Sequence, residues 1–233
     1  MSDRPVERPA QPETSVAPET AGAPEPLTHR VFGAWHDWST ARGQLAVLAP
    51  EVSVQRLGEA VAFAEEAHGD QKRPAGEPYV EHLLEVVEIL VSGAGVRDED
   101  LLVAAVLHDV VEDTDRTAGE VRERFGPRVE EWVGWVTKPD PEAHEDPAQV
   151  RDRYLLSLRS APPEVLLLKL ADRFSNVQRL DTHPRPEKRR SYYRETRRHL
   201  MPLAAGVPWF EAAFEEWREA YRYLEDGAPA ATD

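Results

Sequence analysis

The chain has 233 residues, with 43 Asp or Glu against 28 Lys or Arg, so its formal net charge is -15. This length suits one domain with a sizeable core, and the negative charge disfavours DNA, RNA and anionic membrane surfaces as partners. The absence of cysteine excludes disulfides, a thiolate nucleophile and Cys-bound zinc. Since no signal-peptide pattern and no apolar run of about 20 residues occurs, we expect a soluble, cytoplasmic protein.

The first segment, residues 1–28, is rich in Pro, Glu, Ala and Thr. Its apolar area is too small to offset the entropy cost of ordering, so we expect a disordered tail. Helical periodicity begins near Val31 and ends near Leu224, and no alternating run between them predicts a strand. The sequence therefore predicts an all-α fold in which residues 29–226 form one domain and 227–233 a second tail.

That domain should be a bundle of about eight to ten helices. In chain order the periodicity predicts helical segments at 31–46, 54–69, 80–93, 99–113, 117–125, 127–136, 150–159, 162–180, 187–204 and 207–225. Capping residues support several starts: Ser53, Asp98, and Thr117 with Glu120 three residues later, which is the capping-box spacing. The acidic, Pro-containing stretch 139–147 should be a loop that joins the two halves.

The segment LLVAAVLHDVVEDT carries the strongest chemical signal. Seven consecutive apolar residues run directly into His108 and Asp109, followed by Glu112 and Asp113. Burying an imidazole and three carboxylates is costly unless they are paired or bind a metal. Glu112 lies four residues after His108, and Asp113 four after Asp109, so each pair shares a helix face. Two groups can hold a metal while two face a substrate; the alternative is an acidic helix end beside a core histidine.

Two further segments hold polar groups in apolar or turn contexts. In VLLLKLADRFSNVQRL, Asp172 interrupts an apolar helix and Asn176 follows one turn later, although a structural ion pair of Asp172 with Lys169 or Arg173 is an alternative. In QKRPAGEPYVEH, a turn leads into a helix whose first turn holds His82. Read alone, His82 suits a helix cap or a surface position.

Taken together, four segments resemble the HD hydrolase domain of the RelA/SpoT family, including its stand-alone small members. These segments are AEEAHGDQKRPAGEPYVEH, AAVLHDVVEDTDRTAGEVRERFGPRVEEWVGWVTK, LLLKLADRFSN and KRRSYYRET, in the family's order. The match covers most of residues 54–204. The string HDVVEDT followed by VTK and KLADR is far more specific than the His-Asp pair that all HD proteins share.

The resemblance implies a single HD domain with one divalent metal ion, usually manganese in this family, held by four ligands: His82, His108, Asp109 and Asp172. Nitrogen and oxygen ligands suit such an ion. Glu112 and Asp113 match the acidic pair that activates or orients the attacking water. The implied reaction is hydrolysis of the alarmone (p)ppGpp at its 3′-diphosphate, which gives GDP or GTP and pyrophosphate.

The resemblance also implies substrate contacts. Arg73 matches an arginine that lines the nucleotide site, and Asn176 an asparagine that faces the ribose and the metal. Three further residues fall where stand-alone members place basic and aromatic contacts: Arg151, Lys188 and Tyr192. For the Arg-rich helix that holds the last two, a solvated face with Glu partners is the alternative.

The sequence departs from the family pattern at Pro74 and Ala75, at Leu83, and at Phe174 and Ser175. These positions concern guanine stacking and substrate preference and not the implied ligands. They keep open a related phosphatase activity such as removal of the 2′-phosphate of NADPH. A non-catalytic alarmone-binding or antitoxin module is a further alternative, whereas a cyclic-nucleotide phosphodiesterase lacks the GEPY and KLADR context. Since no segment matches the family's nucleotidyl-synthetase domain, we expect hydrolysis without synthesis.

Overall fold

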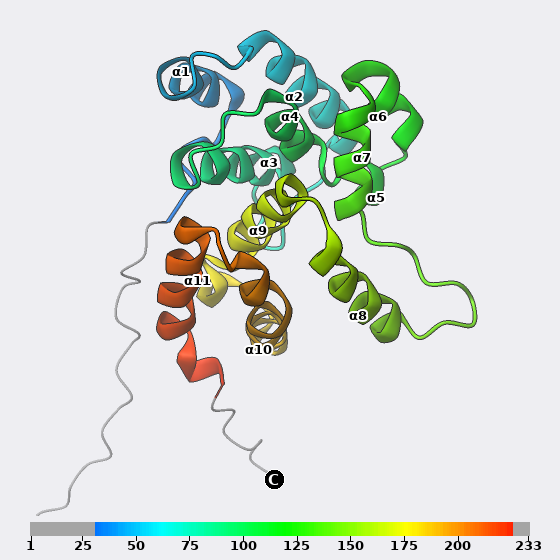
Figure 1. Ribbon diagram of the computed structural model, residues 1–233, viewed down its shortest axis with the longest axis vertical. Helices are drawn as coiled ribbons and strands as arrows, with labels where there is room; N and C mark the ends of the chain where they lie inside the picture. Colours follow the sequence, from blue (N-terminus) through cyan, green and yellow to red (C-terminus); the bar gives the residue numbers. More distant parts are fainter. Residues whose placement is uncertain (1–30, 226–233) are drawn as a thin grey trace, which may run out of the picture.

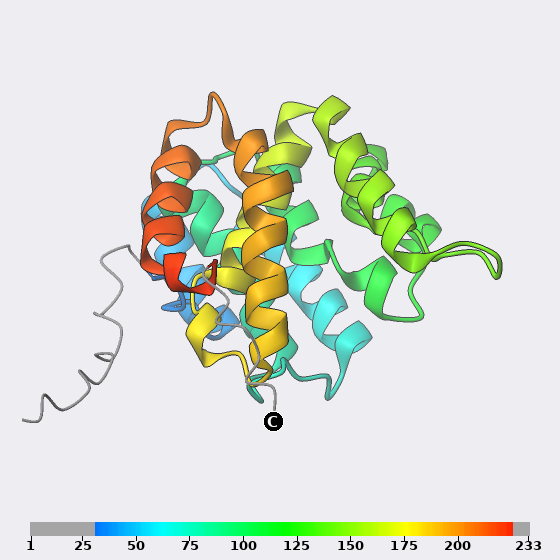
Figure 2. The same ribbon diagram turned by 90° about the horizontal axis from the view of Figure 1, so that it is seen from below.

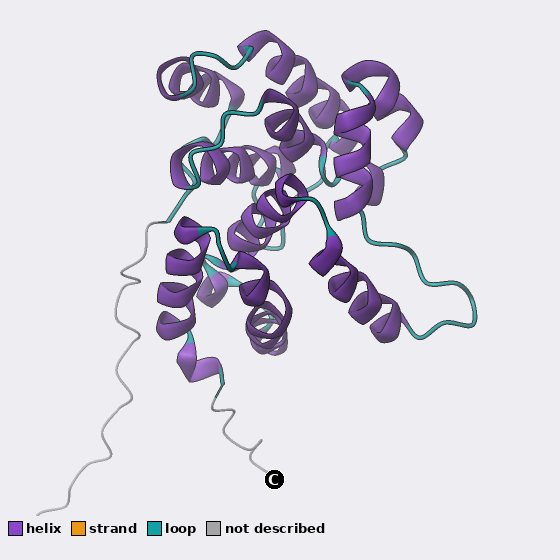
Figure 3. Ribbon diagram, in the orientation of Figure 1, coloured by secondary structure: helices purple, strands orange, loops and turns teal. Residues whose placement is uncertain are grey.

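A computed structural model describes residues 31–225 (Figure 1). Within this range the regular structure is helical, apart from one isolated bridge between Lys72 and Pro78 (Figure 3), so the all-α prediction is confirmed. The two tails expected at 1–28 and 227–233 lie outside the described residues. No helix in the described part is both long and apolar enough to cross a bilayer.

The α-helices of the described residues follow one another in chain order as α1 (Trp38–Leu48), α2 (Val54–His68), α3 (Tyr79–Glu88), α4 (Glu99–Leu107), α5 (Val110–Asp113), α6 (Ala118–Phe125), α7 (Pro127–Val136), α8 (Pro147–Ser157), α9 (Pro163–Val177), α10 (Pro186–Glu195) and α11 (Pro208–Ala220). Short π or 3₁₀ segments extend several of them: η1 (Ile89–Gly93), η2 (Leu158–Ser160), η3 (Leu180–Thr182), η4 (Thr196–Leu200), η5 (Met201–Ala204) and η6 (Arg222–Leu224).

The expected helix caps are present. The side chain of Ser53 accepts from the Arg56 N–H, and that of Asp98 from the Leu101 N–H. Thr117 and Glu120 form both hydrogen bonds of a capping box. These local signals fix the starts of α2, α4 and α6 within one residue of the predicted positions.

The predicted start of the first helix was wrong, because residues 31–37 are not helical and α1 begins at Trp38. The Glu88 carboxylate accepts hydrogen bonds from the backbone N–H groups of Gly33, Ala34 and Trp35, at 3.0, 2.9 and 3.2 Å. Side chains distant in sequence therefore satisfy this backbone in place of helical bonds.

A second difference from the predicted helices concerns the segment 99–113, in which the helix is interrupted at the polar residues His108 and Asp109. Helix α4 ends at Leu107, and α5 restarts at Val110. Asp109 between them has φ -100° and ψ -5°, in the bridge region that is common at active-site residues.

The core is centred on α4, whose residues Leu101–Leu107 are all at most 1% exposed. Helix α9 lies in the middle of the molecule, between the group formed by α1–α7 and the pair α10 and α11 (Figure 1). Seen from below, α10 runs across the face of the molecule, with α11 on one side and α8 on the other (Figure 2). This arrangement brings α3, the α4–α5 junction and α9 together at one site.

Candidate active site

Four polar side chains from α3, the α4–α5 junction and α9 converge and form what we term the ligand cluster: His82, His108, Asp109 and Asp172. The Nε2 atom of His82 lies 3.5 Å from Oδ2 of Asp109 and 3.5 Å from Oδ1 of Asp172. The Nε2 atom of His108 lies 3.1 and 3.6 Å from the same two oxygens. Two imidazole nitrogens and two carboxylate oxygens therefore point at one another.

The other ring nitrogen of each histidine is already engaged. His108 Nδ1 lies 2.8 Å from the Ala105 carbonyl oxygen, which can only accept, so Nδ1 carries a proton. His82 Nδ1 lies 2.8 Å from Ser175 Oγ, whose own proton goes to Glu85 at 2.5 Å. Ser175 therefore accepts from His82, and the Nε2 atoms of both rings face the carboxylates.

Such a cluster requires a cation, and a divalent metal ion fits it. Nε2 of His108 is buried without a hydrogen-bond partner in the described structure. Burial lowers the pKa of His108, but the Asp109 and Asp172 carboxylates outweigh burial and raise the pKa to about 10. The ligand atoms of His82, His108 and Asp109 lie within 4.8 Å of one another, and nitrogen and oxygen donors suit a borderline-to-hard ion.

Two further side chains, besides the two histidines, hold Asp172 in place. Its Oδ2 accepts from Lys169 Nζ at 3.0 Å and its Oδ1 from Asn176 Nδ2 at 2.6 Å. Burial raises the pKa of Asp172, yet Lys169 and the two histidines outweigh it and hold this pKa well below the usual range. The ion pair with Lys169, considered above as a purely structural alternative, is thus present beside the ligand cluster.

The acidic pair, Glu112 and Asp113, occupies two different environments. Glu112 accepts from Lys138 Nζ at 2.6 Å and from the Lys138 backbone N–H at 2.8 Å. Asp113 instead lies 2.8 Å from the Tyr79 hydroxyl, which also reaches Asp109 at 2.6 Å. Partial desolvation and the charges of Asp109 and Glu112 raise the pKa of Asp113, although Tyr79 lowers it. Such a carboxylate is suited to accept a proton.

A cavity lies beside the acidic pair, and four basic side chains, which we term the cationic wall, line it together with that pair: Lys138, Arg151, Lys169 and Arg173. The two arginines share one counter-ion, Glu195 on α10, whose carboxylate accepts from Arg151 at 2.5 and 2.8 Å and from Arg173 at 2.5 Å. Burial raises the pKa of Glu195, but the two guanidinium groups outweigh it and lower the pKa to about 2.

The cavity between these groups has a volume of about 240 Å³. Its lining also includes Tyr79, Tyr154, Asn176 and Tyr192. A second cavity of about 140 Å³ shares Asn176 and Tyr192 with it. Three of the five positions that depart from the family pattern line the second cavity: Pro74, Ala75 and Ser175.

Most of the site residues predicted from the sequence therefore meet around these two cavities. Arg73 lines the second cavity and donates to Asn176 Oδ1 at 3.1 Å. Arg151 and Tyr192 line the first cavity. His82 and His108 line neither cavity, but both lie against Asp109, which lines the first. Lys188 lies apart from the site, because it is exposed on α10 and lines neither cavity.

Several residues of the site were not assigned from the sequence. Tyr79 lies in the GEPY turn, and its position three residues before His82 was the available signal. Lys138 ends the VTK string, and Arg173 follows Asp172 directly. The sequence around Glu195 does not indicate a role for it, because the two arginines that it pairs with lie far away in the chain, on α8 and α9.

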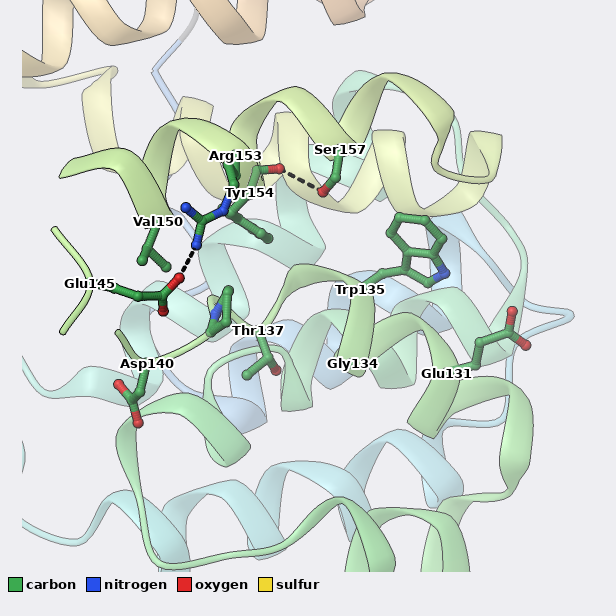
Figure 4. Close-up of a pocket in the computed structure, with 11 residues that line it drawn as sticks. Glu131, Gly134, Trp135, Thr137, Asp140, Glu145, Val150, Arg153, Tyr154 and Ser157 are labelled. Atoms are coloured by element: carbon green, nitrogen blue, oxygen red, sulfur yellow. Dashed lines mark hydrogen bonds and ion pairs between the residues drawn. The ribbon is translucent and has the colours of Figure 1, made fainter. Parts of the chain in front are cut away.

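A third cavity, of about 610 Å³, lies elsewhere, between α7, α8 and the loop that joins them. In Figure 4 the side chain of Arg153 points toward Glu145, with which it forms an ion pair, and Trp135 lies at the opposite end. Tyr154 is the one residue it shares with the first cavity. None of the predicted site residues lines it.

Comparisons with known proteins agree with this geometry. Residues 60–207 match the HD domain family. The chain is 39% identical over 174 residues to a protein of Aquifex aeolicus named guanosine-3′,5′-bis(diphosphate) 3′-pyrophosphohydrolase, covering 74% of this chain and 25% of the relative. It is 35% identical over 193 residues to the bifunctional (p)ppGpp synthase/hydrolase SpoT of Escherichia coli, covering 78% of this chain and 27% of that protein. The chain thus spans about a quarter of the length of these relatives.

A solved structure is similar over almost its whole length. It is described as a metazoan ortholog of SpoT that hydrolyzes ppGpp and plays a role in starvation responses. The TM-score is 0.65 at 29% sequence identity, and the match covers 72% of this chain and 96% of that one. The likeness therefore extends beyond the motifs to the arrangement of the helices.

Proposed function

This chain belongs to the HD-domain family, and on that premise we propose that it hydrolyses (p)ppGpp at the 3′-diphosphate, giving GDP or GTP and pyrophosphate. The observation that carries the proposal is the ligand cluster, which lies at a cavity that also holds an acidic pair and a cationic wall. The names of the relatives and of the similar structure support this substrate.

His82, His108, Asp109 and Asp172 would hold the divalent ion, which we propose to be manganese. Bound there, the ion would act as a Lewis acid and make a bound water more acidic. The hydrogen bonds of the two Nδ1 atoms to Ala105 and Ser175 orient the histidine rings for this role.

Asp113 is the proposed general base. Its carboxylate borders the cavity, and Tyr79 links it to Asp109 of the ligand cluster. Water oxygen would form a bond to the phosphorus next to the ribose while Asp113 accepts the water proton. The bond from that phosphorus to ribose O3′ would break, and O3′ would take up a proton, returned by Asp113 or supplied by solvent, to become the ribose hydroxyl. Glu112, held in place by Lys138, would orient the water.

The substrate carries several negative charges that the carboxylates of the site repel, so the cationic wall would hold its phosphates. The nucleoside would occupy the second cavity, where Arg73 and Asn176 meet. Tyr192 borders both cavities and would lie between the two parts of the substrate.

A second candidate, removal of the 2′-phosphate of NADPH, has a specific observation in its favour. Pro74, Ala75 and Ser175 all line the cavity proposed for the nucleoside. Changes there alter which base is accepted without touching the ligand cluster. The same cluster and acidic pair would serve either phosphate ester.

The test is a product analysis. The purified chain is incubated with ppGpp and separately with NADPH, with and without manganese, and the products are identified by anion exchange. We expect GDP and pyrophosphate from ppGpp, only with metal, and none from the Asp113→Ala variant. Orthophosphate from NADPH with intact ppGpp would instead establish the second candidate.

A further inference from the structure

Two of the four cations in the cationic wall have a counter-ion outside the cavity. Lys138 and Lys169 are paired with Glu112 and Asp172, which themselves line the cavity. Arg151 and Arg173 are paired with Glu195, which lines neither cavity. The two arginines therefore present positive charge to the cavity that no carboxylate within it neutralises.

From this arrangement we propose that Arg151 and Arg173 form a subsite for the diphosphate group, and that Glu195 is a positioning residue that holds both guanidinium groups toward it. The inference rests on the proposed function, because the diphosphate is the group that this reaction releases. It assigns roles to Arg173 and Glu195 and gives Arg151 a specific ligand group.

Hydrogen-bonding capacity supports the subsite. A guanidinium has five N–H donors, and Arg151 uses Nε and Nη2 on Glu195 while Arg173 uses Nη2. Each arginine therefore keeps donors for an anion, in the planar geometry that suits phosphate oxygens. The charges of the two arginines and Glu195 sum to one positive charge, which attracts an anion.

Positioning by Glu195 follows from its location. Its side chain is 14% exposed and joins α8 to α9 from α10. Arg173, with a side chain 8% exposed, also lies over the Tyr192 ring at 5.6 Å. Two like charges that share one cavity repel each other, so without the shared carboxylate they would separate and the donors would lose their common direction.

The experiment titrates inorganic pyrophosphate into the full-length chain by calorimetry in EDTA, so that binding reports on the side chains alone. We expect Arg173→Met and Arg151→Met each to weaken binding about tenfold, since each removes charge-assisted hydrogen bonds. Glu195→Gln should weaken it about fivefold, with Glu195→Asp in between, because the shorter carboxylate retains its charge but not both contacts. Matched controls on α10 are Glu187→Gln and Arg190→Met, both exposed, which should bind like the wild type.

Kinetics on the metal-loaded chain add an independent readout. If Glu195 acts on a group bound in both ground and transition states, Glu195→Gln should raise KM for ppGpp while kcat changes little. Unchanged pyrophosphate binding by both arginine variants would overturn the subsite. Weak binding by those variants together with wild-type or tighter binding by Glu195→Gln and Glu195→Asp would overturn the positioning role. If the wild type leaves ppGpp intact but the ranking of pyrophosphate affinities holds, the proposed function fails and the subsite stands.

Discussion

The ligand cluster and the cationic wall face the same cavity but are built in different ways. The ligand cluster takes two of its four members from adjacent positions, His108 and Asp109, at the end of a buried apolar helix. The cationic wall takes its members from the end of α7, from α8 and from α9, and two of them depend on Glu195 from α10. Local sequence therefore fixes half of the ligand cluster, whereas the cationic wall depends on tertiary packing for its assembly.

The largest expected effect tests the ligand cluster. His108→Ala should abolish binding of the divalent ion and reduce hydrolysis by about a thousandfold or more, since the Lewis acid is lost. Metal content by mass spectrometry and hydrolysis rate are measured together. His144→Ala, an exposed histidine of the α7–α8 loop, is the control and should keep both. A metal-replete His108→Ala variant would contradict the proposed ligand set.

The next effect separates the acidic pair from metal binding. Asp113→Asn should retain the metal and lower kcat by about 10²–10⁴-fold, because the general base is lost. Asp115→Asn, exposed two residues later, is the matched control. Wild-type kcat in the Asp113→Asn variant would show that another group accepts the proton.

A pH-dependent effect on stability tests the cationic wall. The two guanidinium groups hold the pKa of Glu195 at about 2 in the folded chain, against 4.5 for an unpaired glutamate, so its ion pairs stabilise the fold above about pH 4.5. That contribution decreases as the pH falls toward 2, where the folded carboxylate is protonated. Glu195→Gln should therefore lower the free energy of unfolding by about 2 kcal/mol at pH 7. Urea unfolding at pH 7, 5, 4 and 3 should show this difference narrowing below pH 4.5; a constant difference would assign it to packing.

The smallest expected effect concerns the capping box of α6, which belongs neither to the ligand cluster nor to the cationic wall. It shows how much a loss of stability alone changes the hydrolysis rate. Thr117→Ala removes the capping box of α6 and should cost about 1 kcal/mol of unfolding free energy. The hydrolysis rate should not change, because α6 lines neither cavity. Thermal melting and the standard assay measure both, and a loss of activity would mean that stability losses of this size mimic catalytic ones.

The helices and the His108–Asp109 half of the ligand cluster have local signals in the sequence, whereas His82 and Asp172 were expected as its other members only through the family resemblance. Periodicity and caps such as Ser53 and Asp98 mark helix starts. The apolar run before His108 indicates burial, which makes the polar residues that follow conspicuous. The break of that helix at Asp109 was not predictable, since no glycine or proline marks it.

The cationic wall was only partly predictable. Arg151 was anticipated through family resemblance, but the Arg-rich α10 looks like a solvated face, and Lys188 on it is indeed exposed. Glu195 differs from its exposed neighbours through partners 44 and 22 positions away. Pairings of that kind arise from the packing of helices, and a single sequence does not display them.

The hydrogen bonds from the backbone N–H groups of Gly33, Ala34 and Trp35 to Glu88 bear on how far the chain can be shortened at this end of the domain. Phe32 contributes to the same anchor, because its backbone N–H and carbonyl both bond to the buried side chain of Gln178. A truncation that removes residues 32–35 would leave a nearly inaccessible carboxylate and amide without partners in the interior. Shortened versions of this chain should therefore keep Phe32.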